Sequence, residues 1–254
     1  MLTLQHGNGR LPLRKIGAFA EYVVVDQSAV ALMPEGWDFP TAAAIPLAGL
    51  TAYQGIREEL EAKPGQSVLI TGGSGSFGQV AVPVAKAMGL EVIVTDSGRV
   101  REEFLAMGAD RYIDYKKENY WETVSGVDHV IDTLGADEFE HELSVLKKGG
   151  RLLSLRTGPN QAFALKNHFP SAKRALFAMA GAKYDKAARK QGKEYRFLFV
   201  RSDGEQLKAI TDIVEQFHIV PTIDPHVFSL DQAGEALKLM AQGATQGKVI
   251  LRVS

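Results

Sequence analysis

Cysteine is absent from the 254-residue sequence. This absence excludes disulfide bonds, thiolate nucleophiles, iron–sulfur clusters and every zinc site with a cysteine ligand. Histidine is scarce as well: no two of the six histidines lie four residues apart, and Asp224, beside His226, is the only carboxylate that lies two residues from a histidine. Ordinary surface or hydrogen-bonded histidines are the simpler interpretation, so the sequence predicts no metal site.

An excess of charge of one sign is also missing, because 29 basic residues are balanced by 30 acidic ones and the net charge is −1. Such a balance gives no broad attraction to nucleic acid or to an anionic membrane. No apolar run approaches the roughly 18 residues that a membrane helix needs, and the N-terminus has no secretion signal. We therefore expect a cytoplasmic protein whose partner is a small-molecule substrate, with no nucleic-acid or membrane partner.

Serine has no G-x-S-x-G setting anywhere in the chain, so a hydrolase receives no support. The densest basic stretch, Lys183–Arg196, is typical of a solvated helix face, and a surface for an anionic ligand is the alternative.

Short apolar runs alternate with longer stretches of helical periodicity from Val68 onward, a pattern typical of βαβ units and a parallel sheet. The strands are expected at Ser67–Thr71, Glu91–Thr95, Arg111–Ile113, His129–Thr133, Arg151–Leu155 and Arg196–Val200, and helices near Gln79–Met88, Arg99–Met107 and Phe139–Leu146. Gly89, Gly108 and Gly149 are placed to cap these helices. The fold class predicted is α/β with a doubly wound parallel sheet.

The remaining segments are less regular. We expect a strand over Phe19–Val25, a turn at Pro34–Gly36, a helix over Phe39–Glu61 and a helical, basic insertion over about 158–195. In the tail we expect helices at Glu205–Phe217 and Leu230–Ala241, and strands near Val227–Phe228 and Lys248–Val253.

The glycine loop after the first regular strand carries the chemistry. Gly73, Gly75 and Gly78 fit G-x-G-x-x-G, and the motif follows a strand and opens a helix, so its N–H groups can face a pyrophosphate. Gly73 permits the turn, Gly75 lets phosphates approach, and Gly78 lets the helix pack closely. The alternative is merely a tight turn. Pro83 inside the helix predicts a kink or a late helix start.

The end of the next strand bears on the choice between NAD and NADP. Asp96 lies 18 residues beyond Gly78, where a carboxylate can bind the adenosine ribose of NAD. Ser97 and Arg99 follow at once, and a small polar residue with an arginine suits the 2′-phosphate of NADP. A helix cap at Asp96 and a solvent-exposed Arg99 are the structural alternatives.

Several separated segments resemble the zinc-independent quinone oxidoreductase branch of the medium-chain dehydrogenase/reductase superfamily. They are GAFAEYVVVDQSAVALMPEG, AAIPLAGLTAYQGI, VLITGGSGSFGQVAVPVAKAMG, GADRYIDY, GVDHVIDTLG, KKGGRLLSL and GKVILRV, in the family's order. The resemblance implies an NADPH-dependent oxidoreductase that reduces a quinone or enone by hydride transfer without zinc. It favours NADP over NAD, although Asp96 departs from the family pattern.

The resemblance also implies positions for the cofactor. Thr51 lies near the nicotinamide, Gly75, Ser76 and Phe77 at the pyrophosphate, Ser97, Arg99 and Tyr115 around the adenosine phosphate, and Leu134, Gly135, Phe199 and Val200 on the nicotinamide side. Thr51 and Tyr53 are the candidates for polarising a substrate carbonyl; Tyr53 has helical spacing with Leu50, which favours core packing instead.

The domains expected from the resemblance are a remnant of the GroES-like, β-rich catalytic domain at 1–40, the Rossmann nucleotide-binding domain at 41–218, and a return to the catalytic domain at 219–254. Most of the family's N-terminal catalytic domain is expected to be lacking. A cofactor-binding, catalytically impaired short form with a regulatory or structural role is therefore the alternative function. The strand near 196–200 is the edge expected to form a homodimer.

Overall fold

The computed structural model describes residues 2–3, 18–73, 75–243 and 245–253. The chain divides into two compact units. The first comprises Met1–Thr51, Gly75–Ala81 and Val200–Ser254, and the second comprises Ala52–Ser74 and Val82–Phe199.

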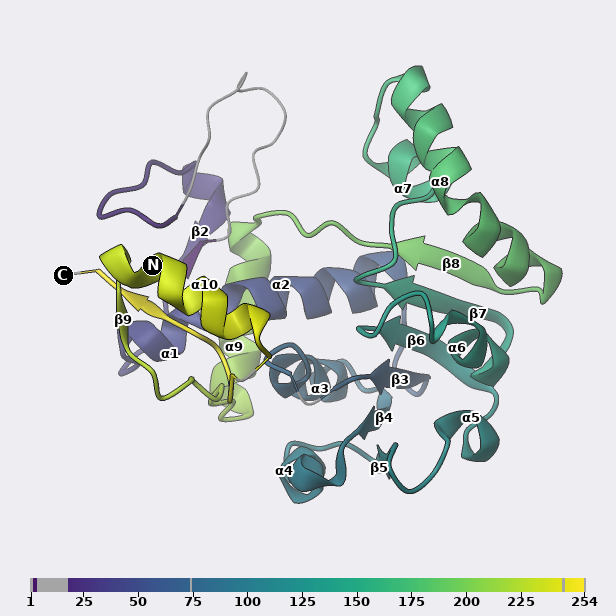
Figure 1. Ribbon diagram of the computed structural model, residues 1–254, viewed down its shortest axis with the longest axis horizontal. Coiled ribbons are helices and arrows are strands. Elements are labelled where there is room, and N and C mark those ends of the chain that lie inside the picture. The colour runs from purple at the N-terminus through teal and green to yellow at the C-terminus, as the bar shows by residue number, and fades with distance from the viewer. Residues whose placement is uncertain (1, 4–17, 74, 244, 254) are drawn as a thin grey trace. The chain divides into compact units, whose positions relative to one another are not determined.

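The second unit is built on a parallel six-stranded sheet (Figure 1). Its strands are β3 (Ser67–Thr71), β4 (Glu91–Asp96), β5 (Arg111–Asp114), β6 (Val127–Asp132), β7 (Leu146–Ser154) and β8 (Glu194–Phe197), in the order β5-β4-β3-β6-β7-β8. All six strands predicted from the sequence are present, with ends shifted by a few residues. The order of the strands reverses direction between β3 and β6, which is the doubly wound Rossmann topology.

Helices connect these strands, as the alternating pattern predicted. They are α3 (Gly78–Ala87), the 3₁₀ turn η3 (Gly98–Val100), α4 (Arg101–Ala106), α5 (Tyr120–Thr123), α6 (Phe139–Val145), α7 (Gln161–Lys166) and α8 (Ser171–Lys190). Helix α3 begins at Gly78 and runs through Pro83, so the late start is wrong.

The three glycines predicted as helix caps differ from one another. Gly89 and Gly108 have φ of 77° and 104° just beyond α3 and α4, as predicted. Gly149 has a φ of 79° but lies inside β7, because that strand begins directly after α6. Its N–H donates to the Gly192 carbonyl at 2.7 Å, so the cap prediction for Gly149 is wrong.

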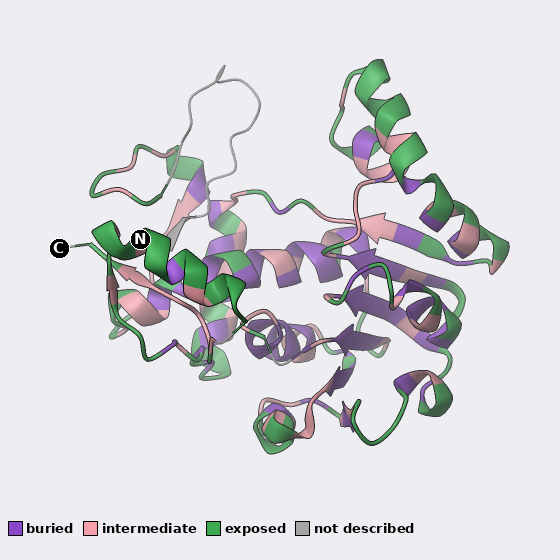
Figure 2. Ribbon diagram, viewed as in Figure 1, coloured by how far each residue is buried: buried purple, intermediate pink, exposed green. Residues whose placement is uncertain are grey.

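The core of this unit lies between the sheet and helices α5, α6 and α8 (Figure 2). Its members include Leu69, Val130 and Leu152 from the strands, each fully buried. Tyr184 of α8 stacks on Tyr195 of β8 at a centroid distance of 5.2 Å. Burying a large apolar side chain contributes about 1.5–3 kcal/mol, so this layer supplies much of the unit's stability.

The stretch predicted as a helical insertion is formed by α7 and α8, which connect β7 to the parallel edge strand β8. The charged side chains of Lys183 and Lys186 are exposed, as expected of a solvated helix face. Lys193 differs: it is buried, and its Nζ donates to the Leu143 carbonyl at 2.5 Å.

The first unit contains short elements. They are β1 (Leu2–Thr3), the 3₁₀ turn η1 (Gln27–Ala29), β2 (Val30–Ala31), α1 (Phe39–Ala43), α2 (Pro46–Gln54, ending across the boundary), α9 (Gly204–Gln216), β9 (Phe228–Ser229), the 3₁₀ turn η4 (Leu230–Gln232), α10 (Ala233–Ala241) and β10 (Leu251–Arg252). Strand β1 pairs with β2 antiparallel, and β9 pairs with β10 parallel. The two predicted tail helices are confirmed.

The strand predicted over Phe19–Val25 is wrong. This segment forms no strand in the described part of the chain, and Tyr22 and Val24 are 90% and 92% exposed. Aromatic and β-branched residues favour strands when they pack on a half-buried pleated surface, and that surface is not provided here. The predicted final strand is shorter than expected, because Lys248 makes only an isolated bridge with Ile223.

The helix predicted over Phe39–Glu61 is divided into α1, α2 and the π-helical turn η2 (Gly55–Glu59). Pro46 starts the second segment, since its ring disfavours the helical conformation at the residue before it. No helix in the described ranges is both long enough and apolar enough to cross a bilayer.

Candidate functional site

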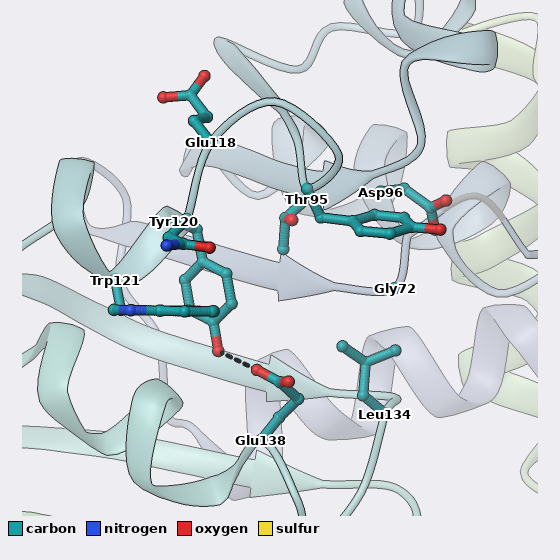
Figure 3. Close-up of a pocket in the computed structure, with 10 residues that line it drawn as sticks. Gly72, Thr95, Asp96, Glu118, Tyr120, Trp121, Leu134 and Glu138 are labelled. Atoms are coloured by element: carbon teal, nitrogen blue, oxygen red, sulfur yellow. Dashed lines mark hydrogen bonds between the residues drawn. The ribbon is translucent and has the colours of Figure 1, made fainter.

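A cavity of about 440 Å³ opens at the carboxyl ends of β3, β4, β5 and β6 (Figure 3). Its lining residues are Gly72, Thr95, Asp96, Tyr115, Glu118, Asn119, Tyr120, Trp121, Leu134 and Glu138. The strand order reverses between β3 and β6, and open α/β sheets bind ligands outside the carboxyl ends of their strands at such a point.

The loop after β3 begins with two glycines that pack too closely for any side chain. A Cβ on Gly72, whose φ is 62°, would lie 2.6 Å from both Thr133 Oγ1 and a Leu134 methyl group. A Cβ on Gly73 would lie 2.5 Å from a Val94 methyl group. Gly73 therefore serves close packing against β4, in addition to the turn predicted for it.

The third glycine of the loop is different. A Cβ on Gly75 would meet no atom of the described residues within 4 Å. Helix α3 follows from Gly78. The free space beside the Gly75 backbone fits a group such as a phosphate that approaches main-chain N–H groups.

The end of β6 is held by hydrogen bonds from neighbouring backbone. Asp132 Oδ1 accepts from the N–H groups of Leu134 and Gly135, both at 2.7 Å. Thr133 Oγ1 donates to the carbonyl oxygens of Thr71 and Gly72 at 2.7 and 3.2 Å. These bonds fix the turn after β6 against the start of the glycine loop, and Leu134 lines the cavity (Figure 3).

A second cavity of about 460 Å³ lies beyond β4 and β5. It is lined by Ser97, Gly98, Arg99, Asp114, Tyr115, Lys116 and Lys117. Three cationic side chains and two hydroxyl groups therefore line this cavity together with a single carboxylate, Asp114. Such a donor set suits a dianion such as a phosphate monoester.

The backbone around this second cavity is closely packed. A Cβ on Gly98 would overlap the Asp114 carboxylate. The Tyr112 hydroxyl donates to the Ser97 carbonyl at 2.7 Å, and Asp96 Oδ1 accepts from the Ser97 N–H at 2.6 Å. Burial raises the pKa of Tyr112, so its hydroxyl remains a donor at neutral pH.

The wall of the first cavity opposite Asp96 is aromatic. Tyr120 donates its hydroxyl to Glu138 Oε2 at 3.0 Å, which Figure 3 shows as a dashed line. Trp121 stacks on His141 with ring centroids 3.7 Å apart. Burial raises the pKa of Tyr120, and the nearby carboxylates act in the same direction.

The structure brings together part of the set of predicted site residues. Asp96, Tyr115 and Leu134 line the first cavity; Ser97, Arg99 and Tyr115 line the second. Gly73 and Gly135 lie in the loops after β3 and β6 in the same unit, which also contains Tyr53 and Phe199. Thr51, Gly75, Ser76, Phe77, Gly78 and Val200 belong to the first unit.

The two candidates for carbonyl polarisation have structural roles in the chain. Thr51 Oγ1 donates to the Leu47 carbonyl at 2.6 Å within α2. Tyr53 is half-buried, with the Arg57 guanidinium 5.8 Å from its ring centroid. Phe199 is 58% exposed and Val200 is buried.

Sequence reasoning missed most of the residues on the far side of both cavities. Lys116, Lys117 and the segment Glu118–Trp121 line them, and so does Glu138. A signal was present, because two lysines directly follow the strand that neighbours the Asp96 strand. These lysines can be assigned to the cavity only when the strand order is known, because that order brings β5 beside β4.

Metal ligands do not gather in the part of the chain that the structure describes. The described residues contain no cluster of three histidine, aspartate or glutamate side chains that could hold a metal ion. The Asp224 and His226 pair is in contact, with Nδ1 and Oδ1 2.6 Å apart.

Comparison with known proteins gives the family. Residues 107–251 match the family described as zinc-binding dehydrogenase. The chain belongs to this family. Within the medium-chain dehydrogenase/reductase superfamily it is placed in the zinc-independent quinone oxidoreductase branch, as the resemblance of its motifs predicted.

Three relatives illustrate the match. A 2-methylene-furan-3-one reductase of Solanum lycopersicum is 32% identical over 241 residues, covering 94% of this chain and 53% of that protein. The quinone oxidoreductase of Coxiella burnetii is 28% identical, with a TM-score of 0.69, covering 87% of this chain and 62% of the other. The quinone oxidoreductase of Thermus thermophilus, also solved in complex with NADPH, is 26% identical, with a TM-score of 0.67, covering 93% and 73%. The chain thus spans about half the length of the tomato enzyme.

Proposed function

We propose that this chain is an NADPH-dependent, zinc-independent oxidoreductase that reduces a quinone or an enone-type substrate by hydride transfer. The observation that carries the proposal is the second cavity, where Arg99, Lys116 and Lys117 converge beside the ends of β4 and β5. This cation cluster adjoins the nucleotide-sized cavity at the switch point of the sheet, and Tyr115 lines both.

The residues present fit NADPH at its adenosine end. The first cavity would take the adenine and ribose, with Asp96 and Tyr115 beside the ribose. The second would take the 2′-phosphate, with Ser97 donating a hydrogen bond and Arg99 and Lys116 neutralising the charge. Asp96 alone would favour NAD, but it already accepts a hydrogen bond from the Ser97 N–H. The second cavity holds three cations against the one carboxylate of Asp114, which favours NADPH.

The remaining contacts follow from the loops. In the first unit, the N–H groups of Gly75–Gly78 would have the pyrophosphate role that the family resemblance implies. In the second unit, the Leu134–Gly135 turn would orient the nicotinamide. NADPH, when bound, supplies the hydride; the chain's own residues hold it, orient it and exclude water. No dedicated acid or base is needed from the protein for this role.

The test is a fluorescence titration with NADPH and NADH side by side, followed by NADPH oxidation in the presence of a quinone and of a small enone. Tighter binding of NADPH and steady oxidation with one substrate are expected. Binding without oxidation would favour the alternative function, a catalytically impaired cofactor-binding protein. No binding of either nucleotide at millimolar concentration would overturn the proposal.

A further inference from the structure

A buried carboxyl group, Glu142 of α6, lies between the two loops of the proposed nucleotide site without touching either cavity. Its side chain is fully buried. Glu142 Oε1 accepts a hydrogen bond from Thr71 Oγ1 at 2.7 Å, and Thr71 is the last residue of β3, directly before the glycine loop. Thr71 is fully buried as well, so this bond is shielded from water.

Asp132, the last residue of β6, interacts with the same carboxyl group. All hydrogen bonds described for the Asp132 carboxylate are accepted by it. Oδ1 accepts from the Leu134 and Gly135 N–H groups, and Oδ2 accepts from the Ser154 and Thr157 hydroxyls at 2.5 and 3.3 Å. Asp132 therefore acts as an ionised acceptor, and it is 1% exposed.

The second oxygen of Glu142, Oε2, is buried and has no donor among the described residues. Two facing carboxylates with an unsatisfied oxygen would be strongly unfavourable in a buried setting. A proton on Glu142 resolves both problems, because a neutral carboxylic acid donates to the neighbouring carboxylate.

The charged groups that act most strongly on Glu142 are acidic. Asp132 lies on β6, Glu138 is the N-cap residue of α6, and Tyr120, whose hydroxyl donates to Glu138, lies on α5 (Figure 3). Burial and the Asp132 charge raise the pKa of Glu142 to about 9, against the lowering effect of the Thr71 hydrogen bond. The group is therefore neutral across the physiological range.

We propose that Glu142, as a neutral carboxylic acid, is a positioning residue for the nucleotide site: it joins Thr71, at the start of the glycine loop, to Asp132, which orients the Leu134–Gly135 turn. The inference rests on the proposed function, because these are the loops assigned to the cofactor. Deprotonation of Glu142 places two negative charges side by side in the core. The loops then separate, and the site loses its geometry.

The test compares wild type, Glu142→Gln and Glu142→Leu, with Glu140→Gln on the exposed face of α6 as the matched control. The dissociation constant for NADPH is measured from about pH 6 to about pH 10. For wild type we expect a constant value up to the pKa of Glu142, about 9, and then a rise of up to tenfold per pH unit, as loss of one proton dictates. Glu142→Gln keeps one donor and one acceptor, so its profile should stay flat; Glu142→Leu should bind at least tenfold more weakly at every pH.

Thermal unfolding without nucleotide gives an independent measurement. The folded protein binds a proton that the unfolded chain releases above the ordinary glutamate range, so the melting temperature of wild type should fall as pH rises from about 5 to about 9. Glu142→Gln should show a smaller fall and the higher melting temperature at pH 8, whereas Glu140→Gln should follow wild type. This measurement stands even if Glu142→Leu fails to fold.

If wild type binds nucleotide, but wild type and Glu142→Gln have identical pH profiles in both binding and melting, the positioning role alone is overturned. Absence of nucleotide binding by wild type at every pH would overturn the proposed function, and this inference with it.

Discussion

Arg99 is the residue on which the preference for NADPH depends most directly. Its guanidinium group lines the second cavity with Lys116 and Lys117. A charge-assisted hydrogen bond contributes about 1.5–3 kcal/mol. We therefore expect Arg99→Gln to weaken NADPH binding about 10- to 100-fold, with NADH affinity changed little, in fluorescence titrations.

Arg101→Gln is the matched control, because Arg101 lies two residues further on and its guanidinium binds Glu102 at 3.0 Å outside the cavity.

The three cationic side chains of the second cavity are exposed, so raising the salt concentration should weaken NADPH binding more than NADH binding. Equal losses for both nucleotides in Arg99→Gln would contradict the assignment of this cavity to the 2′-phosphate.

Two glycines of one loop should respond differently to alanine. The Cβ of Gly73→Ala would meet a Val94 methyl group at 2.5 Å, and such overpacking costs about 1–3 kcal/mol of unfolding free energy. The Cβ of Gly75→Ala would meet no described atom, so its stability should match wild type while its nucleotide affinity falls, because the methyl group occupies the space assigned to a phosphate.

Urea unfolding and NADPH titration on both variants separate the two effects. A Gly75→Ala protein that binds NADPH as tightly as wild type would contradict the phosphate role of this loop.

At the residue scale, the sequence could predict the ribose and phosphate side of the site but not the opposite wall. Asp96, Ser97 and Arg99 follow a strand that the pattern identifies, and two cavities contain them. Tyr120 and Glu138 lie on different elements and meet only through tertiary packing, at 3.0 Å. The burial and neutral state of Glu142 could not be predicted either, since an exposed and a buried glutamate look alike in a single sequence.

Among the elements, β3 and β6 are joined at their amino ends by Asp128. Its carboxylate accepts from the Ser67 N–H and hydroxyl, both at 3.0 Å, and pairs with Lys147. Although burial opposes the shift, the bonds from Lys147 and Ser67 lower the pKa of Asp128 to about 2. A carboxyl group whose pKa is lower in the folded protein than in the unfolded chain stabilises the fold at any pH above its unfolded-state pKa. This contribution is lost as the pH falls from about 4 to about 2.

Asp128→Asn should therefore reduce the unfolding free energy by about 1 kcal/mol at pH 7, a value that allows for solvent screening of the half-exposed Lys147. Urea unfolding at pH 7, 4 and about 3 should show the difference between the two proteins shrinking as the pH falls. A difference that stays constant over this range would mean that the Asp128 charge does not contribute.

Most elements of the sheet could be predicted, because buried parallel strands form apolar runs between helical periods. The segment Phe19–Val25 has the same composition but forms no strand, since Phe19, Tyr22 and Val24 are exposed and strand propensity depends on a neighbouring surface. The cap prediction for Gly149 was wrong for a different reason: its φ is positive as expected, but the helix had already ended at Val145. The apolar pattern does not contain the order of the strands, which the structure provides.

For the whole molecule, the edge of the sheet predicts how two copies would assemble. Strand β8 pairs with β7 on one side and ends the described sheet on the other, and an edge strand presents unpaired backbone groups that a second copy can satisfy. A two-fold pairing of β8 with its counterpart would extend the sheet across two subunits. We therefore expect a homodimer with twice the chain mass of 27.6 kDa in sedimentation equilibrium.

Phe199 tests this edge because it lies two residues beyond β8 and is 58% exposed. Phe199→Lys would bring two like charges together at a two-fold contact. The dissociation constant of the dimer should therefore rise at least tenfold, while the melting temperature of the monomer should stay unchanged. Phe217→Lys, at an exposed phenylalanine remote in sequence from β8, is the control and should remain dimeric. A wild-type protein that sediments as a monomer at high micromolar concentration would rule out the β8 interface, since an edge that stays unpaired at that concentration cannot hold two subunits together in solution.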